Sequence, residues 1–410
     1  MTRQISNAAP ELAINGGSPL CAEPFPLWPH FGKEEIEAVE RVLVSGKVNY
    51  WTGEESRNFE REYADAVGTK YAVALMNGTV ALEAALRALG IGPGDEVVVP
   101  CRTFIASASA VVMCGATPVM ADVDPISQNV TVETIAPALT QRTRALIAVH
   151  LAGWPCEMDS LLTLAARHNF YVIEDCAQAH GATYNGRQVG SFGHAAAFSF
   201  CQDKILTTGG EGGMLTTNDR SIWERAWSFK DHGKGWDAVY NQQHPDGFRW
   251  LHDSFGTNWR LTEMQAAIGR VQLRRLPVWV KQRRENARML EEGFSRIPSL
   301  RVTRPQDDIG HSYYKYYVFV RPERLAPGWT RDRIVQAIQA EGIPCMAGIC
   351  PEVYLEKAFR NIEQRPITRL AVARELGESS LTFLVHPTLK AEHMQQTSGV
   401  VKKVMREASV

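Results

Sequence analysis

The sequence predicts an α/β fold, with a large domain built on a mostly parallel seven-stranded sheet flanked by helices and a smaller C-terminal α+β domain. Three observations support this prediction. Short apolar runs are bounded by turn residues, helical periodicities lie between these runs, and the pattern changes after about residue 275. A chain of 410 residues is also long for a single hydrophobic core, which favours two domains.

The chain begins with a segment that favours neither helix nor strand. It contains the Gly16-Gly17 pair, followed by four prolines (Pro19, Pro24, Pro26 and Pro29). We expect an extended N-terminal arm over residues 1–32, a large domain over 33–275 and a small domain over 276–410.

Seven runs in the large domain have the composition of strands that are buried on both faces. In chain order they are YAVALM (71–76), EVVVP (96–100), PVMADV (118–123), ALIAVH (145–150), FYVIEDC (170–176), AAAFSF (195–200) and GGMLTTN (212–218). Helical patterns separate several of them, as in VALEAALRAL (80–89), from Ile105 onward and near 157–168. This alternation is typical of a mainly parallel sheet.

The small domain has a different pattern. Residues 276–298 read as one long helix rich in Arg and Glu, and YYKYYVFVRP (313–322) reads as a strand. TRDRIVQAIQAEG (330–342) is an amphipathic helix with a glycine stop at Gly342.

Composition narrows the class of protein. The 44 basic and 45 acidic residues nearly cancel and form no basic block, so we expect no nucleic-acid partner. No apolar run approaches the roughly 18 residues of a membrane span, so we expect a cytoplasmic protein without a membrane partner. The eight cysteines are scattered without metal-ligand spacing, so we expect reduced thiols and no metal site.

Polar residues gather where predicted strands end, which is where open parallel sheets bind ligands. Asn77-Gly78-Thr79 ends one strand and opens a helix, which fits either a helix N-cap or a phosphate site. Asp175 follows a buried strand and needs a positive partner, which could be a local cation or a protonated ring nitrogen.

Two further strand ends carry an amine and an aromatic ring. Lys204 follows Ser199 and precedes a glycine-rich loop, so it could be an exposed lysine or an amine that forms an imine with an aldehyde. Phe104 could pack in a core or stack on a flat cofactor. Together the four features supply the groups needed to hold pyridoxal 5′-phosphate (PLP). The glycines lie between two strands and do not match a dinucleotide-binding fingerprint.

Five motifs, in order, resemble those of the DegT/DnrJ/EryC1/StrS aminotransferase family. They are NGTVALEAALRALGIGPGDEVVVP, TFIASASAV, IEDCAQAHGA, SFCQDKILTTGGEGGMLTTND and GTNWRLTEMQAAIGRVQL. The resemblance extends from about Pro29 to His386. It implies the fold type I of PLP-dependent transferases and a PLP cofactor. The glycine loop has one glycine more than the family's usual G-E-G-G run.

The resemblance also implies roles for individual positions. Lys204 matches the lysine that carries PLP as a Schiff base, and Asp175 matches the carboxylate that pairs with the pyridine nitrogen. Gln178 matches the residue that contacts the phenolic oxygen of the cofactor, and Phe104 matches the aromatic ring that stacks on it.

The remaining matches concern the phosphate. Ser199, Gly78 and Thr79 match phosphate ligands within the same chain. Asn258 matches an asparagine that the neighbouring subunit supplies to the phosphate, which implies a homodimer with a shared active site.

The family resemblance implies an aminotransferase that moves an amino group from an amino acid, usually L-glutamate, to a ketone. Lysine at 204 argues against the dehydratases of the family, which have histidine there. We expect a nucleotide-linked keto-deoxysugar as acceptor, with a keto-inositol or an aminohydroxybenzoate-type substrate as the alternative. A PLP-dependent lyase or aldolase on the same fold is an alternative of another class. Candidate substrate contacts are Trp51, Thr52, His232, Lys234, Tyr316 and Tyr317.

Overall fold

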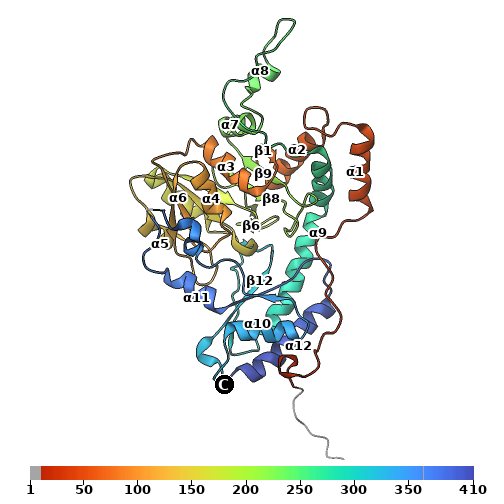
Figure 1. The fold of residues 1–410 in the computed structure, drawn as a ribbon, viewed down its shortest axis with the longest axis vertical. Helices are drawn as coiled ribbons and strands as arrows, with labels where there is room; N and C mark the ends of the chain where they lie inside the picture. Colours follow the sequence, from red (N-terminus) through yellow and green to blue (C-terminus); the bar gives the residue numbers. More distant parts are fainter. Residues whose placement is uncertain (1–10, 363) are drawn as a thin grey trace, which may run out of the picture.

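A computed structural model describes residues 11–362 and 364–410 of the chain. Its largest element is a seven-stranded sheet at the centre of the upper body of the molecule (Figure 1). The strands, in sheet order, are β1 (Tyr71–Leu75), β9 (Gly213–Thr217), β8 (Ala195–Ser199), β5 (Tyr171–Asp175), β4 (Thr143–Val149), β2 (Glu96–Pro100) and β3 (Thr117–Ala121). All seven coincide with the apolar runs, so the predicted sheet is confirmed.

Six of these strands run parallel to one another, and β9 runs antiparallel to both of its neighbours, β1 and β8. The reversal has a local cause. The chain turns back directly after β8, pairing Ser199 with Gly213, so the loop from residue 200 to 212 is held between two adjacent strands. Lys204 lies in this loop.

Helices cover both faces of the sheet. On one face, Val73 and Leu75 of β1 belong to the same core as α3 (Gly78–Ala88), α4 (Ala106–Met113) and α7 (Arg220–Lys230). On the other face, Ala72 and Ala74 share a core with α2 (Glu55–Val67) and part of α9 (Glu263–Phe294). Helices α5 (Val132–Ile135) and α6 (Met158–His168) pack on that second face beside β4 and β5. Alternate strand residues therefore face opposite layers, as strand geometry requires.

A second, four-stranded sheet forms the core of the small domain. Its order is β10 (Leu300–Arg301), β12 (Tyr316–Val320), β14 (Ser380–Phe383) and β13 (Cys345–Met346), with every pairing antiparallel. Helices α10 (Arg331–Ala340) and α12 (Ala391–Ala408) pack against it, while α11 (Ala371–Ser379) contributes to the core of the large domain. A small three-stranded sheet joins β11 (Ile309–Gly310), β6 (Thr183–Tyr184) and β7 (Arg187–Gln188).

Helix α9 connects the two domains as one continuous element of 32 residues. It begins at the Thr262 cap and passes through the predicted boundary between residues 275 and 276. Its early residues, such as Leu273, pack beneath the large sheet, whereas Leu290 and Phe294 lie in the core of the small domain. Pro277 lies near the middle of the helix.

The described part of the N-terminal arm, from residue 11, packs on the small domain and then continues to helix α1 (Lys33–Ser45). The carboxylate of Glu341 accepts hydrogen bonds from the backbone N–H groups of Ala13 and Leu20, at 2.9 Å each. Lys403 pairs with the same carboxylate at 2.7 Å. This buried pair fixes the arm to the end of α10.

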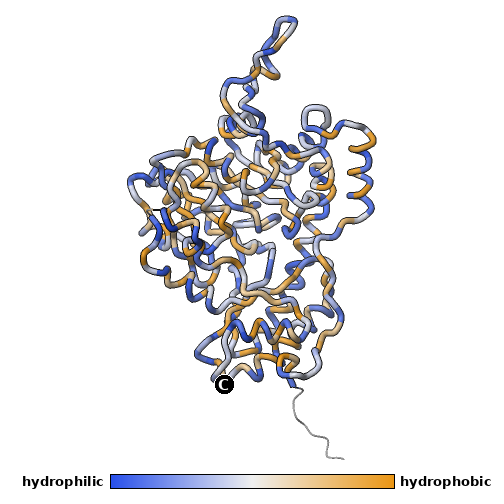
Figure 2. The backbone as a smooth tube through the Cα atoms, in the orientation of Figure 1, coloured by the Kyte–Doolittle hydropathy of each residue, from blue (hydrophilic) through white to orange (hydrophobic). Residues whose placement is uncertain are grey.

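Helix α1 lies along the outside of the molecule against α9 (Figure 1). Along α1, hydrophilic and hydrophobic colours alternate in Figure 2. Its inner face buries Ala38 and Val42. None of the helices in the described residues combines the length and the apolar character needed to cross a membrane.

Candidate active site

A cavity of about 490 Å³ opens at the carboxyl ends of the parallel strands, and we call it the sheet-edge cavity. One wall comes from the large domain and the other from the small domain, including Tyr314, Lys315 and Met346. The predicted site residues that line it are Gly78, Thr79, Phe104, Asp175, Gln178, Ser199, Lys204 and Tyr317.

The start of α3 lies at one end of this cavity and has the backbone geometry that favours an anion. Asn77 caps the helix, its Oδ1 accepting a hydrogen bond from the N–H of Val80 at 2.9 Å. The N–H groups of the first turn at Gly78 and Thr79 remain available for an anion, which the helix dipole favours. A Cβ at Gly78 would approach Cβ of Ser199 to 2.6 Å, so only glycine lets these two elements meet.

Ser199 is held at this end by a buried histidine. Nε2 of His180 donates to the carbonyl oxygen of Ser199 at 2.9 Å, so Nδ1 is the acceptor for the hydroxyl of Tyr63, at 2.8 Å. Burial lowers the pKa of His180 to about 4. The ring is therefore neutral near pH 7, and this hydrogen-bond pattern is retained.

Asp175 ends β5 and is only 6% exposed. One carboxylate oxygen accepts a hydrogen bond from the hydroxyl of Ser107 at 2.8 Å, and the other accepts one from the N–H of Ala177 at 3.1 Å. Burial raises the pKa of Asp175, and these two hydrogen bonds together with the charge of Lys204 oppose the rise. The carboxylate is thus oriented by two donors, and it has no cation in direct contact among the described residues.

Gln178 and Phe104 have orientations suited to a flat ligand. The side-chain oxygen of Gln178 accepts the N–H of Ala152 at 2.8 Å, which leaves the amide N–H₂ free to donate. Phe104 is 63% exposed although it lines the cavity. A large apolar ring held open in this way offers a face for stacking.

Lys204 projects into the cavity from the loop between β8 and β9. Its Nζ lies 3.7 Å from a carboxylate oxygen of Asp203 and 4.8 Å from the centre of the Tyr314 ring. The hydroxyl of Tyr314 donates to Asp203. The indole N–H of Trp28, in the arm, donates to the backbone carbonyl of Lys204 at 2.8 Å. The lysine is therefore fixed by the arm and by the small domain.

The glycines that follow Lys204 have a structural explanation, including the additional one. Gly209 and Gly210 both adopt positive φ, 88° and 134°, where side chains are strained. A Cβ at Gly213 would lie 2.2 Å from the carbonyl oxygen of Asn77. Two glycines before Glu211 are needed for the turn. Gly213 is needed for close approach to the start of α3, and a Cβ at Gly212 would lie 2.1 Å from Oγ1 of Thr208.

The other predicted site residues do not reach the sheet-edge cavity of their own chain. Most of them form a separate group, which we call the distal cluster: Trp51, Thr52, His232, Lys234 and Asn258. Lys234 places its Nζ 4.1 Å from the centre of the Trp51 ring and 2.9 Å from buried Asp231. Asn258 forms a β-bridge with Asp231, and His232 donates its N–H to Thr257.

Tyr316 and Tyr317 separate because they are neighbours on β12 and point to opposite faces. Tyr317 lines the cavity, and its hydroxyl accepts the N–H of Ile349 at 3.0 Å. Tyr316 is 2% exposed and lies in the core of the small domain.

The structure adds residues to the site that the sequence did not reveal. Ser107 lies one helical turn after Thr103, and their hydroxyls are 2.9 Å apart. The serine spacing in TFIASASAV offered a weak signal for this contact. Asp203 and Lys315 also line the cavity, and nothing in the local pattern distinguished them from surface residues.

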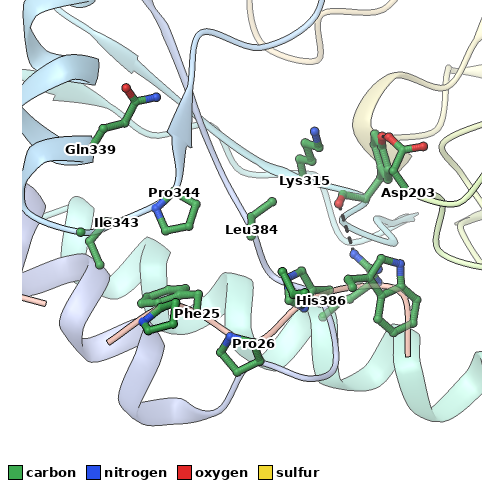
Figure 3. Close-up of a pocket in the computed structure, with 15 residues that line it drawn as sticks. Phe25, Pro26, Asp203, Lys315, Gln339, Ile343, Pro344, Leu384 and His386 are labelled. Atoms are coloured by element: carbon green, nitrogen blue, oxygen red, sulfur yellow. Dashed lines mark hydrogen bonds between the residues drawn. The ribbon is translucent and has the colours of Figure 1, made fainter. Parts of the chain in front are cut away.

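A second cavity, of about 540 Å³, lies between the arm and the small domain, and we call it the arm cavity. Phe25, Pro26 and Leu384 give it largely apolar walls (Figure 3). Asp203, Tyr314 and Lys315 line both cavities and so separate one from the other.

The sheet-edge cavity fits PLP. The buried carboxylate of Asp175 lacks a direct cationic partner, which a protonated pyridine nitrogen would supply. The anion site at α3 suits the phosphate, the Phe104 face suits the ring, and Lys204 supplies an amine for the aldehyde.

Comparison with known proteins agrees with this chemistry. Residues 29–404 match the model of the DegT/DnrJ/EryC1/StrS aminotransferase family. The structure of an aminotransferase from Psychrobacter cryohalolentis is similar, with a TM-score of 0.93, 54% identity, and coverage of 94% of this chain and all of that one.

Two relatives are similar over most of their length. A GDP-perosamine synthase from Caulobacter vibrioides is 43% identical, covering 85% of this chain and 89% of that protein. A putative L-glutamine:3-amino-2,3-dideoxy-scyllo-inosose aminotransferase from Streptoalloteichus tenebrarius is 36% identical, covering 81% of this chain and 79% of that protein. The chain therefore belongs to the DegT/DnrJ/EryC1/StrS family and is a PLP-dependent aminotransferase.

Proposed function

We propose that this enzyme transfers the amino group of an amino acid, L-glutamate, to the keto group of a nucleotide-linked keto-deoxysugar. The observation that carries the proposal is the pairing, in one cavity, of the Lys204 amine with the buried Asp175 carboxylate. The similarity to a GDP-perosamine synthase supports a nucleotide-linked sugar as acceptor.

The proposed roles follow from the geometry. PLP, when bound, supplies a ring that takes up the electrons of the carbon losing a proton and a carbon that carries the amino group from donor to acceptor. Asp175 holds a proton on the ring nitrogen, because its buried carboxylate favours a positive neighbour. Lys204, the residue proposed to carry PLP, accepts the proton from the donor carbon at Nζ and returns it during transfer.

Other residues would position the cofactor. Gly78, Thr79 and Ser199 bind its phosphate, and Phe104 stacks on its ring. Gln178 donates its free amide N–H to the phenolic oxygen. Tyr317 is the remaining candidate for a substrate contact from this chain, since it lines the cavity.

The assay that tests this function measures the reaction with the amino donor and the reaction with the keto acceptor one after the other. PLP-loaded enzyme mixed with L-glutamate alone is expected to release one 2-oxoglutarate per site and convert bound PLP to its amine form. Later addition of a nucleotide-linked 4-keto-6-deoxyhexose should restore PLP and yield the amino sugar. Absorbance and mass spectrometry follow both stages.

The acceptor panel also includes a keto-inositol, because a relative is named as a scyllo-inosose aminotransferase. Amination of the keto-inositol with no reaction of the sugar nucleotide would overturn the proposed acceptor. Bond cleavage in the amino acid or sugar without amine transfer would support a lyase or aldolase.

We further propose that the enzyme is a homodimer with a shared active site. The distal cluster does not line its own sheet-edge cavity, yet it combines aromatic, cationic and amide groups at one place. Beside it, the segment from 241 to 256 projects from the body beyond α8 (Trp236–Tyr240) (Figure 1). Phe248, Trp250 and Phe255 in this segment are 75%, 83% and 100% exposed. Aromatic side chains left open in this way favour a protein interface.

Helix α1 supports the same proposal. Ile36, Leu43 and Val44 on its outer side are all more than half exposed, which is unusual for three apolar side chains on one helix. A second copy of the chain would cover them. In such a dimer, Asn258 of each subunit reaches the phosphate in the other, and Trp51, Thr52, His232 and Lys234 approach the sugar substrate.

Hybrid dimers test the shared site. Co-expression of Lys204→Ala and Asn258→Asp chains with different affinity tags allows tandem purification of the mixed dimer. If sites are shared, one site carries both defects and the other none, so about half of the wild-type activity returns. Each homodimer should be nearly inactive. A Lys204→Ala/Lys281→Met hybrid gives the half-activity reference, since Lys281 is exposed. An inactive Lys204→Ala/Asn258→Asp hybrid would contradict the shared site.

A cytoplasmic location is part of the same proposal. All eight cysteines are free, and six of them are buried, which fits a reducing compartment.

A further inference from the structure

Lys315 is a cation of the sheet-edge cavity that has no assigned partner. It precedes β12 and lines both cavities. In the part of the chain that the structure describes, its Nζ donates one hydrogen bond, to the sulfur of Met346 at 4.0 Å, which is a weak acceptor. Among the described residues, Lys315 forms no ion pair with a carboxylate within 4.0 Å, unlike Lys204, which approaches Asp203.

The Lys315 ammonium and the Lys204 amine both lie near the ring of Tyr314. Nζ of Lys315 is 5.3 Å from the centre of the Tyr314 ring, and Nζ of Lys204 is 4.8 Å from the same point. The two nitrogens are therefore no more than about 10 Å apart. Asp203 and Lys315 lie beside each other at one end of the arm cavity (Figure 3). Asp203 is the carboxylate that interacts with both lysines, while Asp175 and Glu211 line other parts of the same cavity.

Burial makes the lack of a direct carboxylate partner costly for Lys315. Desolvation lowers the pKa of Lys315, opposed by the charge of Asp203 and assisted by that of Lys204. A partly buried ammonium gains most from a ligand that is anionic and hydrogen-bonds directly. With the cofactor phosphate placed at the start of α3, the remaining anions at this site are those of the substrates.

We propose that Lys315 binds the α-carboxylate of the amino donor, an assignment that rests on the proposed aminotransferase function. The two amines are no more than about 10 Å apart, so hydrogen bonds of about 3 Å that both point into the space between them leave at most about 4 Å between the groups they contact. That distance matches the span from the α-carbon, where Lys204 removes a proton, to the adjoining carboxylate. The distal carboxylate of an extended glutamate lies two methylene groups farther away.

The diphosphate of a sugar nucleotide fits this position less well. Its charge is separated from the keto carbon by the sugar ring, and it carries two negative charges. Lys315 is a single cation beside the negative Asp203.

A non-reacting donor tests the assignment without relying on turnover. 2-Methyl-L-glutamate has no α-hydrogen, so it binds but cannot lose a proton to Lys204. Calorimetric titration of the PLP-loaded wild type should give a Kd that rises roughly 10- to 100-fold in Lys315→Met, the loss typical of a charge-assisted hydrogen bond. Lys315→Arg should keep most of the affinity, and Lys281→Met, an exposed lysine 79% open to solvent, should leave it unchanged.

A matched pair of amides identifies which carboxylate is bound. L-Isoglutamine lacks the α-carboxylate charge, and L-glutamine lacks the distal one. Wild type should react roughly 10- to 100-fold less efficiently with L-isoglutamine than with L-glutamate, and Lys315→Met should abolish that difference. Discrimination in the variant equal to that in the wild type would overturn the proposal.

Two other outcomes would also overturn it. One is an unchanged Kd for 2-methyl-L-glutamate in a Lys315→Met protein whose thermal unfolding matches wild type. The other is a defect confined to the half-reaction with the keto sugar, which would place the acceptor at Lys315. If wild type takes no amine from any amino acid, the proposed function itself fails, and this is seen before any variant is made.

Discussion

Replacement of Lys204 by alanine is expected to lower the rate of transamination by about 10⁴-fold or more, the upper range for removal of an acid–base group. The reason is geometric, because Trp28 and the Tyr314–Asp203 pair hold this one amine in place, and Lys315 starts from a different wall of the cavity. Single-turnover measurement with L-glutamate checks the rate.

Covalent attachment of the cofactor provides a second measurement. After borohydride treatment and denaturation, mass spectrometry should show PLP attached to wild type and Lys315→Met but not to Lys204→Ala. Attachment that persists in Lys204→Ala would show that another amine carries the cofactor, and the role of Lys204 would be refuted.

Asp175→Asn is expected to reduce kcat by roughly 10²–10³-fold, as for loss of other electrostatic stabilisers. The amide keeps the volume of the side chain but cannot hold a positive charge on the ring nitrogen. Asp175→Glu should retain more activity than Asp175→Asn. Steady-state kinetics at saturating PLP separates this effect from weaker cofactor binding. Equal kcat values for wild type and Asp175→Asn would exclude the proposed role.

The dependence of activity on pH provides a second test of the role of the Asp175 carboxylate. Burial raises the pKa of Asp175, whereas a protonated ring nitrogen beside it would lower that pKa, so the two effects oppose each other in the PLP-loaded enzyme; activity should fall on the acid side where the carboxylate gains a proton. Ser107→Ala removes a donor that stabilises the ionised form, so the acid limb should move to higher pH. An acid limb that stays in place would show that Asp175 does not control it.

The sequence predicted those parts of the molecule that depend on local patterns. The seven strands of the large sheet were recognisable as apolar runs, and Asp175 and Ser199 stood at strand ends because parallel strands terminate at one edge. Lys204 became distinctive only in combination with them.

Contacts across long stretches of chain were not predictable in this way. Ser107 meets Asp175 over 68 positions, and Trp28 meets Lys204 over 176, without any local signal. The choice between Tyr316 and Tyr317 depended on the strand register, which a run of aromatic residues does not reveal. The distal cluster is ordered within one chain, but the cavity it is proposed to serve belongs to another.

The continuity of α9 restricts how the site can open. Helix α9 runs from the core of the large domain into the core of the small domain without an intervening loop, so it joins the two walls of the sheet-edge cavity rigidly. Separating the walls therefore means bending a helix of 32 residues, with Pro277, which has no N–H to lose, as the least costly point. Helix α9 therefore limits how far the two walls can move apart, and Pro277 is the position where it bends most easily. A substrate enters a cleft whose width is largely set by this helix.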